Sequence, residues 1–346
     1  MATMPNRTPL RAARSAVTAA LTAALLAALA ACGSGGGGSG PFAGEDIDLV
    51  VPYEPGGGYD AYARVLAPHL EDCLDATVVV RNEPGAGGLV ATARTAAAGA
   101  DENRIEIVNT VGLVSAQIAQ AAGVSFDLNE LNWIGRVAAP PNVVVVGASN
   151  PIQTFSDLVH PGRPVRFVTT GPGANDYIAP NILGAAYGFP MEIVTGFAGA
   201  PEARSAIVAG SADAHVLPVD SQLAGIESGD VRPVVTLDGE RDPLVPDTPT
   251  VYETSPPDGH TKAMIDSLVT LGRTGRGLIA PPEMPQERVE ALRAAFRCAV
   301  GDERLIDELA QQQRPLDPLG GPETAQLVTE ALAAPEEFRQ LIVASY

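Results

Sequence analysis

Apolar residues from about residue 46 onward follow two alternating patterns. Short β-branched runs, such as Leu49-Val50-Val51 and Val78-Val79-Val80, predict buried strands. Between such runs apolar residues recur every three or four positions, as they do over 59–74, and this spacing predicts amphipathic helices. Strands that alternate with helices are typical of α/β architecture with a mostly parallel sheet.

A second strand-and-helix series begins near residue 151 and is followed by a return to the first. Pro140-Pro141 precedes this second series, and a strand predicted at 277–280 resumes the first one. The order predicts two lobes joined by two crossovers, and clefts between lobes are favoured ligand sites. We therefore expect an α/β fold of two lobes, each a mixed, mostly parallel sheet flanked by helices, with a ligand cleft between them. Lobe I is assigned to residues 45–138 and 239–346, and lobe II to residues 139–238.

Two strand-to-helix turns in the first series are built alike. Glu54-Pro55-Gly56-Gly57-Gly58 follows one β-branched run, and Glu83-Pro84-Gly85-Ala86-Gly87-Gly88 follows the next. Glycine lets the backbone approach a ligand closely and adopt positive φ, and a helix N-terminus behind the turn presents free N–H groups to an anion. The two turns predict a site that holds a small anion with main chain.

Composition and charge narrow the possible partners. Hydrophobic residues make up 46% of the chain and charged residues 18%, so the chain can bury a sizeable core. The net charge of −19 argues against nucleic acid as a partner. It also repels anions at long range, so any anion site must be local.

The N-terminal segment, residues 1–32, is predicted to be a lipoprotein signal peptide. Basic residues precede an Ala- and Leu-rich stretch that ends in Leu29-Ala30-Ala31-Cys32-Gly33, which resembles the lipobox of bacterial lipoproteins. That resemblance implies a lipid-modified Cys32 and an anchor in the membrane. The alternative is an ordinary signal peptide with an incidental cysteine. Residues 33–44 then form a Gly/Ser tether.

Two further cysteines, Cys73 and Cys298, lie on predicted helices. Outside the cytoplasm they could form a disulfide, and two buried free thiols are the alternative, since sequence does not supply the Cβ geometry.

Catalytic motifs are missing from the sequence. The histidines are scattered, with no metal-binding pair at helical spacing and no nucleophile elbow in the folded part. His215 fits a packed core residue better than a base. We therefore expect no catalytic residues, no metal and no cofactor.

Five segments together resemble a known family. Beside the two glycine turns they are Gly171-Pro172-Gly173-Ala174, Asp247-Thr248-Pro249-Thr250-Val251-Tyr252-Glu253 and Gly277-Leu278-Ile279-Ala280-Pro281-Pro282-Glu283-Met284-Pro285. Their order and spacing are similar to those of the substrate-binding proteins of tripartite tricarboxylate transporters, the TctC or Bug family.

The resemblance implies a monomeric, extracytoplasmic receptor with a two-lobe periplasmic-binding-protein-like fold of type II. Such receptors capture small carboxylates for two membrane subunits of the transporter. The alternative is an orphan binding protein of the same fold that presents its solute to a signalling receptor.

The family pattern also implies which residues surround the ligand. Asp60 fits an N-cap better than a ligand group, and Asn82 either binds the ligand or braces the Pro84–Gly88 turn. The first lobe would contribute Tyr53, Gly57, Gly58, Asp60, Asn82, Ala86, Gly87 and Gly88. The second lobe would contribute Thr170, Gly173, Ala174, Asn175, Asp176, Phe197, Ala198, Gly199 and Asp220.

Departures from the family pattern bear on the ligand. Asp176 stands in a turn that usually carries serine and often histidine, the loop 195–199 lacks the usual lysine, and Glu54 stands where the family often has a small residue or proline. We hypothesise a ligand with one carboxylate, or a zwitterionic or neutral one, with Asp176 or Glu54 facing any ammonium group. The alternative is that Asp176 caps the following helix and Glu54 points to solvent.

Overall fold

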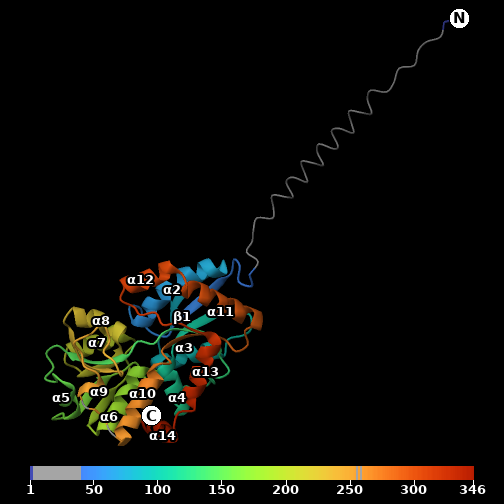
Figure 1. Ribbon diagram of the computed structural model, residues 1–346. Helices are drawn as coiled ribbons and strands as arrows, with labels where there is room; N and C mark the ends of the chain where they lie inside the picture. The colour runs from blue at the N-terminus through green and yellow to red at the C-terminus, as the bar shows by residue number, and fades with distance from the viewer. Residues whose placement is uncertain (3–39, 255, 258) are drawn as a thin grey trace.

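The computed structural model describes residues 1–2, 40–254, 256–257 and 259–346 (Figure 1). The predicted signal peptide with its lipobox at Cys32, and most of the predicted tether at 33–44, lie outside the described residues. Among the residues that the structure does describe, no helix has the length and apolar character needed to cross a membrane.

The first sheet has six strands in the order β11-β4-β10-β3-β1-β2. Its members are β1 (Asp46–Val51), β2 (Thr77–Asn82), β3 (Arg104–Asn109), β4 (Asn132–Ala138), β10 (Arg276–Ala280) and β11 (Leu319–Gly320). Strands β2, β1 and β3 are parallel, whereas β10 is antiparallel to both of its neighbours.

The second sheet has five strands in the order β7-β6-β8-β5-β9. Its members are β5 (Asn142–Gly147), β6 (Val165–Val168), β7 (Met191–Val194), β8 (Ala214–Pro218) and β9 (Val231–Leu237). Strands β7, β6 and β8 are parallel, and β5 is antiparallel to β8 and β9. Both sheets are mixed as expected, but antiparallel pairs are no rarer than parallel ones.

Helices flank both sheets, and each parallel strand leads into one of them. They are α2 (Gly58–Leu74), α3 (Leu89–Ala96), α4 (Thr110–Ile118), α5 (Phe155–Val159), α6 (Asn175–Tyr187), α7 (Ala200–Val208), α8 (Val219–Glu227), α9 (Val251–Thr254), α10 (Gly259–Gly272), α11 (Gln286–Val300), α12 (Glu303–Gln311), α13 (Gly321–Leu332) and α14 (Glu336–Ala344). A short 3₁₀ helix, η1 (Ala86–Gly88), precedes α3.

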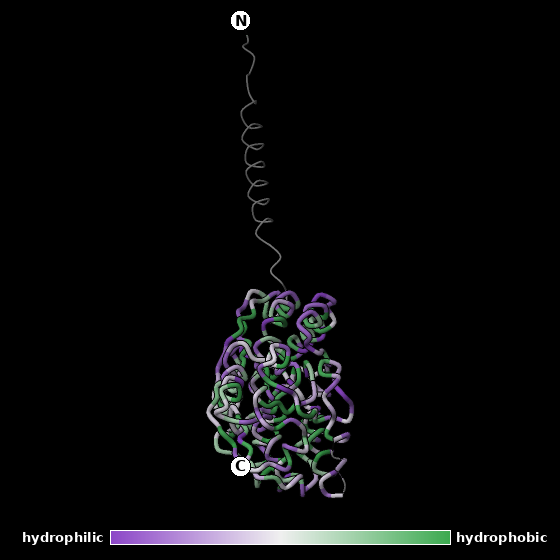
Figure 2. The backbone as a smooth tube through the Cα atoms, turned by 90° about the vertical axis from the view of Figure 1, so that its left-hand side faces the viewer, coloured by the Kyte–Doolittle hydropathy of each residue, from purple (hydrophilic) through white to green (hydrophobic). Residues whose placement is uncertain are grey.

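The hydrophobic core continues from one sheet to the other. One cluster packs α2, α11 and α12 on the first sheet. A second cluster combines Val108 and Trp133 of the first sheet with Phe167 and Ile178 of the second half. Figure 2 shows hydrophobic stretches running through the body of the molecule and hydrophilic ones along much of its outline.

Strands within residues 45–138 and 239–346 form the first sheet, and strands within residues 139–238 form the second. Two helices do not follow this division. Helix α9 packs against β9, and α10 packs against α6, so both contact the second sheet's half of the molecule. The sequence had assigned them to lobe I with the rest of 239–346. The lobe boundaries remain a prediction.

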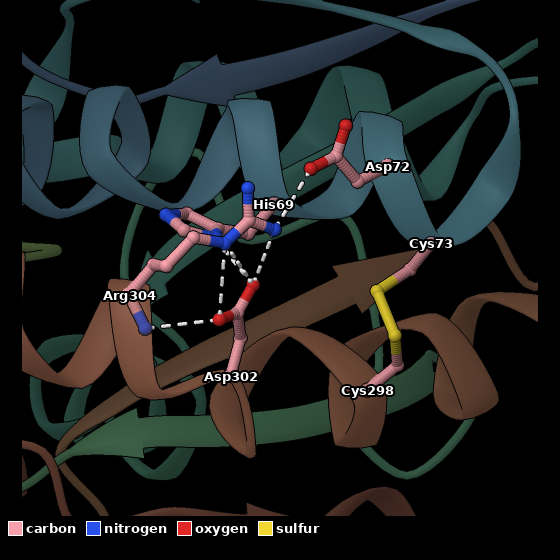
Figure 3. Close-up of a disulfide and its surroundings, with 6 residues drawn as sticks. All are labelled: His69, Asp72, Cys73, Cys298, Asp302 and Arg304. Carbon is pink, nitrogen blue, oxygen red and sulfur yellow. Dashed lines mark hydrogen bonds and ion pairs between the residues drawn. A yellow bond between two sulfur atoms is a disulfide. The ribbon is translucent and has the colours of Figure 1, made fainter.

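A disulfide joins Cys73 of α2 to Cys298 of α11, and the Cα atoms are 6.2 Å apart (Figure 3). Next to it, His69 Nδ1 lies 3.1 Å from Asp302 Oδ2, and Arg304 donates to the same carboxylate and to Asp72. These contacts fasten the C-terminal half of α2 to α11 and α12.

Candidate functional site

A small cavity lies between the two sheets, at the carboxyl ends of their parallel strands. Its volume is about 20 Å³, which is enough for roughly one water molecule. This edge of an open α/β sheet is where ligands characteristically bind. The cavity is lined by Tyr53, Gly57, Gly58, Tyr59, Thr170, Ala174, Asn175, Asp176, Ala200, Leu217 and Ser221.

Four helices begin at the wall of this cavity. Gly58 is the first residue of α2, Asn175 of α6 and Ala200 of α7, and Ser221 lies in the first turn of α8. The first N–H groups of a helix have no partner within it, and the helix dipole places partial positive charge there. Each of these four helices is at least two turns long. Their N-termini together therefore give the cavity a local preference for negative charge.

The first glycine turn is braced from behind by polar side chains. Asp60 Oδ2 accepts from Gly56 N–H at 2.9 Å, and Arg64 pairs with the same carboxylate. Asn82 Nδ2 donates to Tyr53 O at 2.9 Å and to Asp60 Oδ1 at 3.0 Å. These contacts hold the turn so that Gly57 and Gly58 face the cavity.

Two expectations about these bracing residues are corrected. Asp60 is not the N-cap: α2 begins at Gly58 after Gly57, and Asp60 reaches back from the third helical position to the N–H of Gly56. Asn82 braces the first turn and not the Pro84–Gly88 turn, because its amide donates to Tyr53 and Asp60.

The second glycine turn contacts the opposite half of the molecule directly. Gly173 N–H donates to Ala86 O at 3.2 Å, and a Cβ on Gly87 would lie 2.7 Å from Gly171 O. Gly87 has φ of 69°, which also favours glycine. Ala86 and Gly87 therefore lie in a contact between the halves, and neither they nor Gly88 line the cavity.

A chain of buried polar groups also crosses between the halves. Asn109 Nδ2 lies 3.2 Å from Tyr53 Oη and 3.1 Å from Asn175 Oδ1, and Asn175 donates to Asn142 at 2.8 Å. Burial raises the pKa of Tyr53 well above the ordinary tyrosine value, so its phenol stays protonated and donates to Gly87 O at 3.1 Å. The chain fixes two cavity residues, Tyr53 and Asn175, relative to each other.

Asp176 lines the cavity but is held by its own half of the molecule. Its carboxylate accepts from Thr169 Oγ1 at 2.7 Å and Thr170 N at 3.0 Å, and His215 Nε2 lies 3.3 Å away. It does not cap the following helix, because α6 begins at Asn175 after Ala174 and Asp176 is already the second helical residue. His215 is fully buried in β8. The side chain of Glu54 is exposed, as the alternative interpretation expected.

The loop before α7 meets the first glycine turn. Glu54 N–H donates to Ala198 O at 3.2 Å, and Ala198 N–H donates to Glu202. Asp220 lies behind the cavity, where both carboxylate oxygens are engaged by arginines: Arg276 Nη2 at 2.9 Å and Arg314 Nη1 at 3.1 Å.

The structure therefore brings part of the expected set together at the cavity. Tyr53, Gly57, Gly58, Thr170, Ala174, Asn175 and Asp176 line it, whereas Asp60, Asn82, Ala86, Gly87, Gly88, Gly173, Phe197, Ala198, Gly199 and Asp220 do not. Sequence reasoning missed Tyr59, Ala200, Leu217 and Ser221 as lining residues. Pro201 early in α7 marks a helix start, and this signal could have pointed to Ala200.

Within the part of the chain that the structure describes, no cluster of three or more histidine, cysteine or carboxylate side chains is arranged to hold a metal ion.

Comparison with known proteins gives the same architecture. The chain is similar to a protein of the tcbD-tcbE intergenic region of Pseudomonas sp. strain P51, with 28% identity over 78% of each chain. Its structure superposes on the periplasmic binding protein BugD with a TM-score of 0.73, covering 87% of this chain and 97% of that one at 20% identity. It superposes equally on the malate-bound MatC from Rhodopseudomonas palustris, with a TM-score of 0.73, 21% identity and coverage of 86% and 99%.

A two-sheet α/β architecture, with helix N-termini around a cavity between the halves, is the fold that this chain shares with the periplasmic binding protein BugD. The family model described as "Tripartite tricarboxylate transporter family receptor" matches residues 62–337, and the chain belongs to that family. The resemblance stated from the sequence is thus confirmed.

Proposed function

We propose that this receptor is an extracytoplasmic lipoprotein, anchored through Cys32, that captures a small carboxylate for the membrane subunits of a tripartite tricarboxylate-type transporter. The observation that carries the carboxylate assignment is the convergence of four helix N-termini on one cavity. Family membership supports the transporter partnership, and the lipobox sequence supports the anchor.

The cavity wall favours a ligand with one carboxylate and a short apolar body. The rings of Tyr53 and Tyr59, with centroids 5.0 Å apart, and Leu217 supply apolar surface beside the helix ends. Asp176 faces the same cavity, so a second anionic group on the ligand would be repelled by it. An ammonium group near Asp176 would be accommodated, which keeps a zwitterion within the proposed class.

Ligand entry requires the halves to separate. A volume of about 20 Å³ is far below the several hundred Å³ typical of small-molecule sites. The contacts of Gly87 with Gly171 and of Glu54 with Ala198 close the cavity on two sides. Hinged closure around a ligand is the motion expected for this fold.

Calorimetry on the full chain in detergent tests the carboxylate assignment. Butyrate, malate, citrate and glutamate are titrated at low salt, and we expect butyrate or glutamate to bind more tightly than citrate. Tight citrate binding that Asp176→Ala leaves unchanged would contradict the single-carboxylate assignment, and no binding of any of these acids would contradict the proposed function.

A pair of variants at one position isolates the role of charge. Ala200→Asp adds a negative charge to the cavity wall, at the first position of α7 where an acidic residue does not destabilise the helix. Ala200→Asn has nearly the same size and no charge. We expect at least tenfold weaker acid binding for the Asp variant than for the Asn variant, and equal affinities would exclude this wall from the anion site.

The anchor is tested separately. We expect the full chain to incorporate a palmitate label in a bacterial host and the Cys32→Ala variant to lack it. A label that persists in the variant would contradict anchoring at this cysteine.

A further inference from the structure

Arg276 is a buried cation directly behind the cavity. It is the first residue of β10, pairs with Asn109 of β3 and Ala138 of β4, and is 1% exposed. Its Nη2 donates to Asp220 Oδ1 and to Ser221 Oγ, both at 2.9 Å. A strand of the first sheet thereby holds the first turn of α8, the helix that follows strand β8 of the second sheet.

The same guanidinium contacts the helix that begins at the first glycine turn. Its central carbon lies 5.1 Å from the ring centre of Tyr59 and 4.8 Å from that of Tyr62, both on α2. Burial raises the pKa of both phenols, so they stay uncharged and present their ring faces to the cation. Arg276 thus touches two of the four helices whose ends line the cavity.

These two helix ends approach each other closely. A Cβ placed on Gly58 would lie 2.1 Å from Ser221 Oγ and 3.2 Å from Arg276 Nη2. Two helix N-termini carry partial positive charge and repel each other when they converge. The carboxylate of Asp220, whose side chain is fully buried, offsets this repulsion at α8, and Arg276 keeps that carboxylate in place.

We propose that Arg276 is the positioning residue of the anion site: it fixes the N-termini of α2 and α8 relative to each other by stacking on Tyr59 and Tyr62 and by donating to Asp220 and Ser221. The role rests on the proposed function, because the fixed helix ends are the proposed anion donors. Arginine suits it since one planar group both stacks on rings and donates two hydrogen bonds, which a lysine ammonium cannot do in the same geometry.

Two arginine variants separate positioning from general stability. Arg276→Gln removes the stacking cation, while Arg136→Gln, on the neighbouring strand β4, removes a buried arginine that pairs with the exposed Asp317 and does not touch the cavity. We expect Arg276→Gln to weaken butyrate or malate binding at least tenfold at unchanged stoichiometry. Arg136→Gln should lower thermal stability without changing the affinity. Arg276→Lys should fall between wild type and Arg276→Gln, and it serves as the test variant if the glutamine variant does not fold.

Amide hydrogen exchange tests the same inference without any ligand. We expect peptides covering 58–64 and 219–227 to exchange at least threefold faster in Arg276→Gln, or in the lysine variant, and to be unchanged in Arg136→Gln. Unchanged exchange in both peptides, or equal acceleration in the Arg136 variant, would overturn the positioning role. If wild type bound none of the acids while exchange changed as expected, the proposed function would fail and the contact between the helix ends would stand.

Discussion

The two glycine turns that look alike in sequence have different surroundings. The turn at 54–58 is held from behind by Asp60 and Asn82 and presents Gly57 and Gly58 to the cavity. The turn at 83–88 faces the 171–174 turn of the other half and makes backbone contact with it. In the first turn Gly57 faces the cavity and Gly58 leaves room for the side chain of Ser221, whereas in the second turn Gly87 allows close contact between two backbones.

The helices that follow the two turns are also stabilised differently. Helix α2 is tied covalently to α11 by the Cys73–Cys298 disulfide. Helix α3 is held by hydrogen bonds from Thr92 and Thr95 to Glu106, a carboxylate buried in β3. The difference suggests separate experiments on each turn and its helix.

The largest effect is expected for the disulfide. Replacing Cys73 and Cys298 together by serine removes a disulfide between positions 225 residues apart. A disulfide that closes so long a loop stabilises a fold by about 4 kcal/mol. Denaturant unfolding measures the loss. Because both cysteines lie far along their helices from the cavity, acid affinity should stay within twofold. A large loss of affinity with little loss of stability would show that the disulfide positions the first turn.

Glu106 makes the attachment of α3 dependent on pH. Burial raises the pKa of Glu106 from 4.5 to about 7, so the folded state holds its proton more tightly than the unfolded state. The contribution of this pKa shift to the free energy of unfolding is fully present below about pH 4.5 and is lost as the pH rises through 7. The contribution lost is on the order of 3 kcal/mol.

Glu106→Gln keeps the hydrogen-bond partners of the side chain and removes its titration. We expect the unfolding free energy of the variant to exceed that of wild type progressively from pH 5 to pH 8, measured by urea unfolding at each pH. A difference that does not vary with pH would contradict the raised pKa.

Gly87→Ala tests the contact made by the second turn. The added methyl would lie 2.7 to 2.8 Å from three backbone atoms of 171–174, so the halves cannot close fully. We expect about hundredfold weaker acid binding, which corresponds to about 2.7 kcal/mol, and a larger radius of gyration in small-angle X-ray scattering.

Gly188→Ala is the matched control, since Gly188 has the same φ of 69° and its added methyl meets no atom within 4 Å. The control variant should change neither the affinity for acids nor the radius of gyration. Normal binding by Gly87→Ala would mean that the ligand is held with this contact already open.

The sequence was sufficient to predict the alternation of strands and helices and the amphipathic helix over 59–74, because periodicity and glycine turns report local structure. It did not locate α8, α10 or α14, whose apolar positions are mixed with glycine, proline or charge. It also placed Ala86–Gly88 among ligand donors, because a glycine-rich turn has the same composition whether it meets a ligand or another backbone. Arg276 had no signal at all: only the fold brings it beside Tyr59, Asp220 and Ser221.

The smallest expected effect is that of Asn82→Ala, and it tests which of the two turns Asn82 braces. Its amide donates to Tyr53 O and Asp60 Oδ1 of the first turn, so Asn82→Ala should cost about 1 kcal/mol of stability and weaken acid binding a few-fold. Asn181→Ala, which removes one side-chain bond to Tyr177 O on α6, should lower stability without a change in affinity. Hydrogen exchange in Asn82→Ala should rise in peptides covering 53–60 and stay constant in 84–88. The opposite pattern would mean that Asn82 braces the second turn, and the different roles assigned here to the two turns would then be wrong.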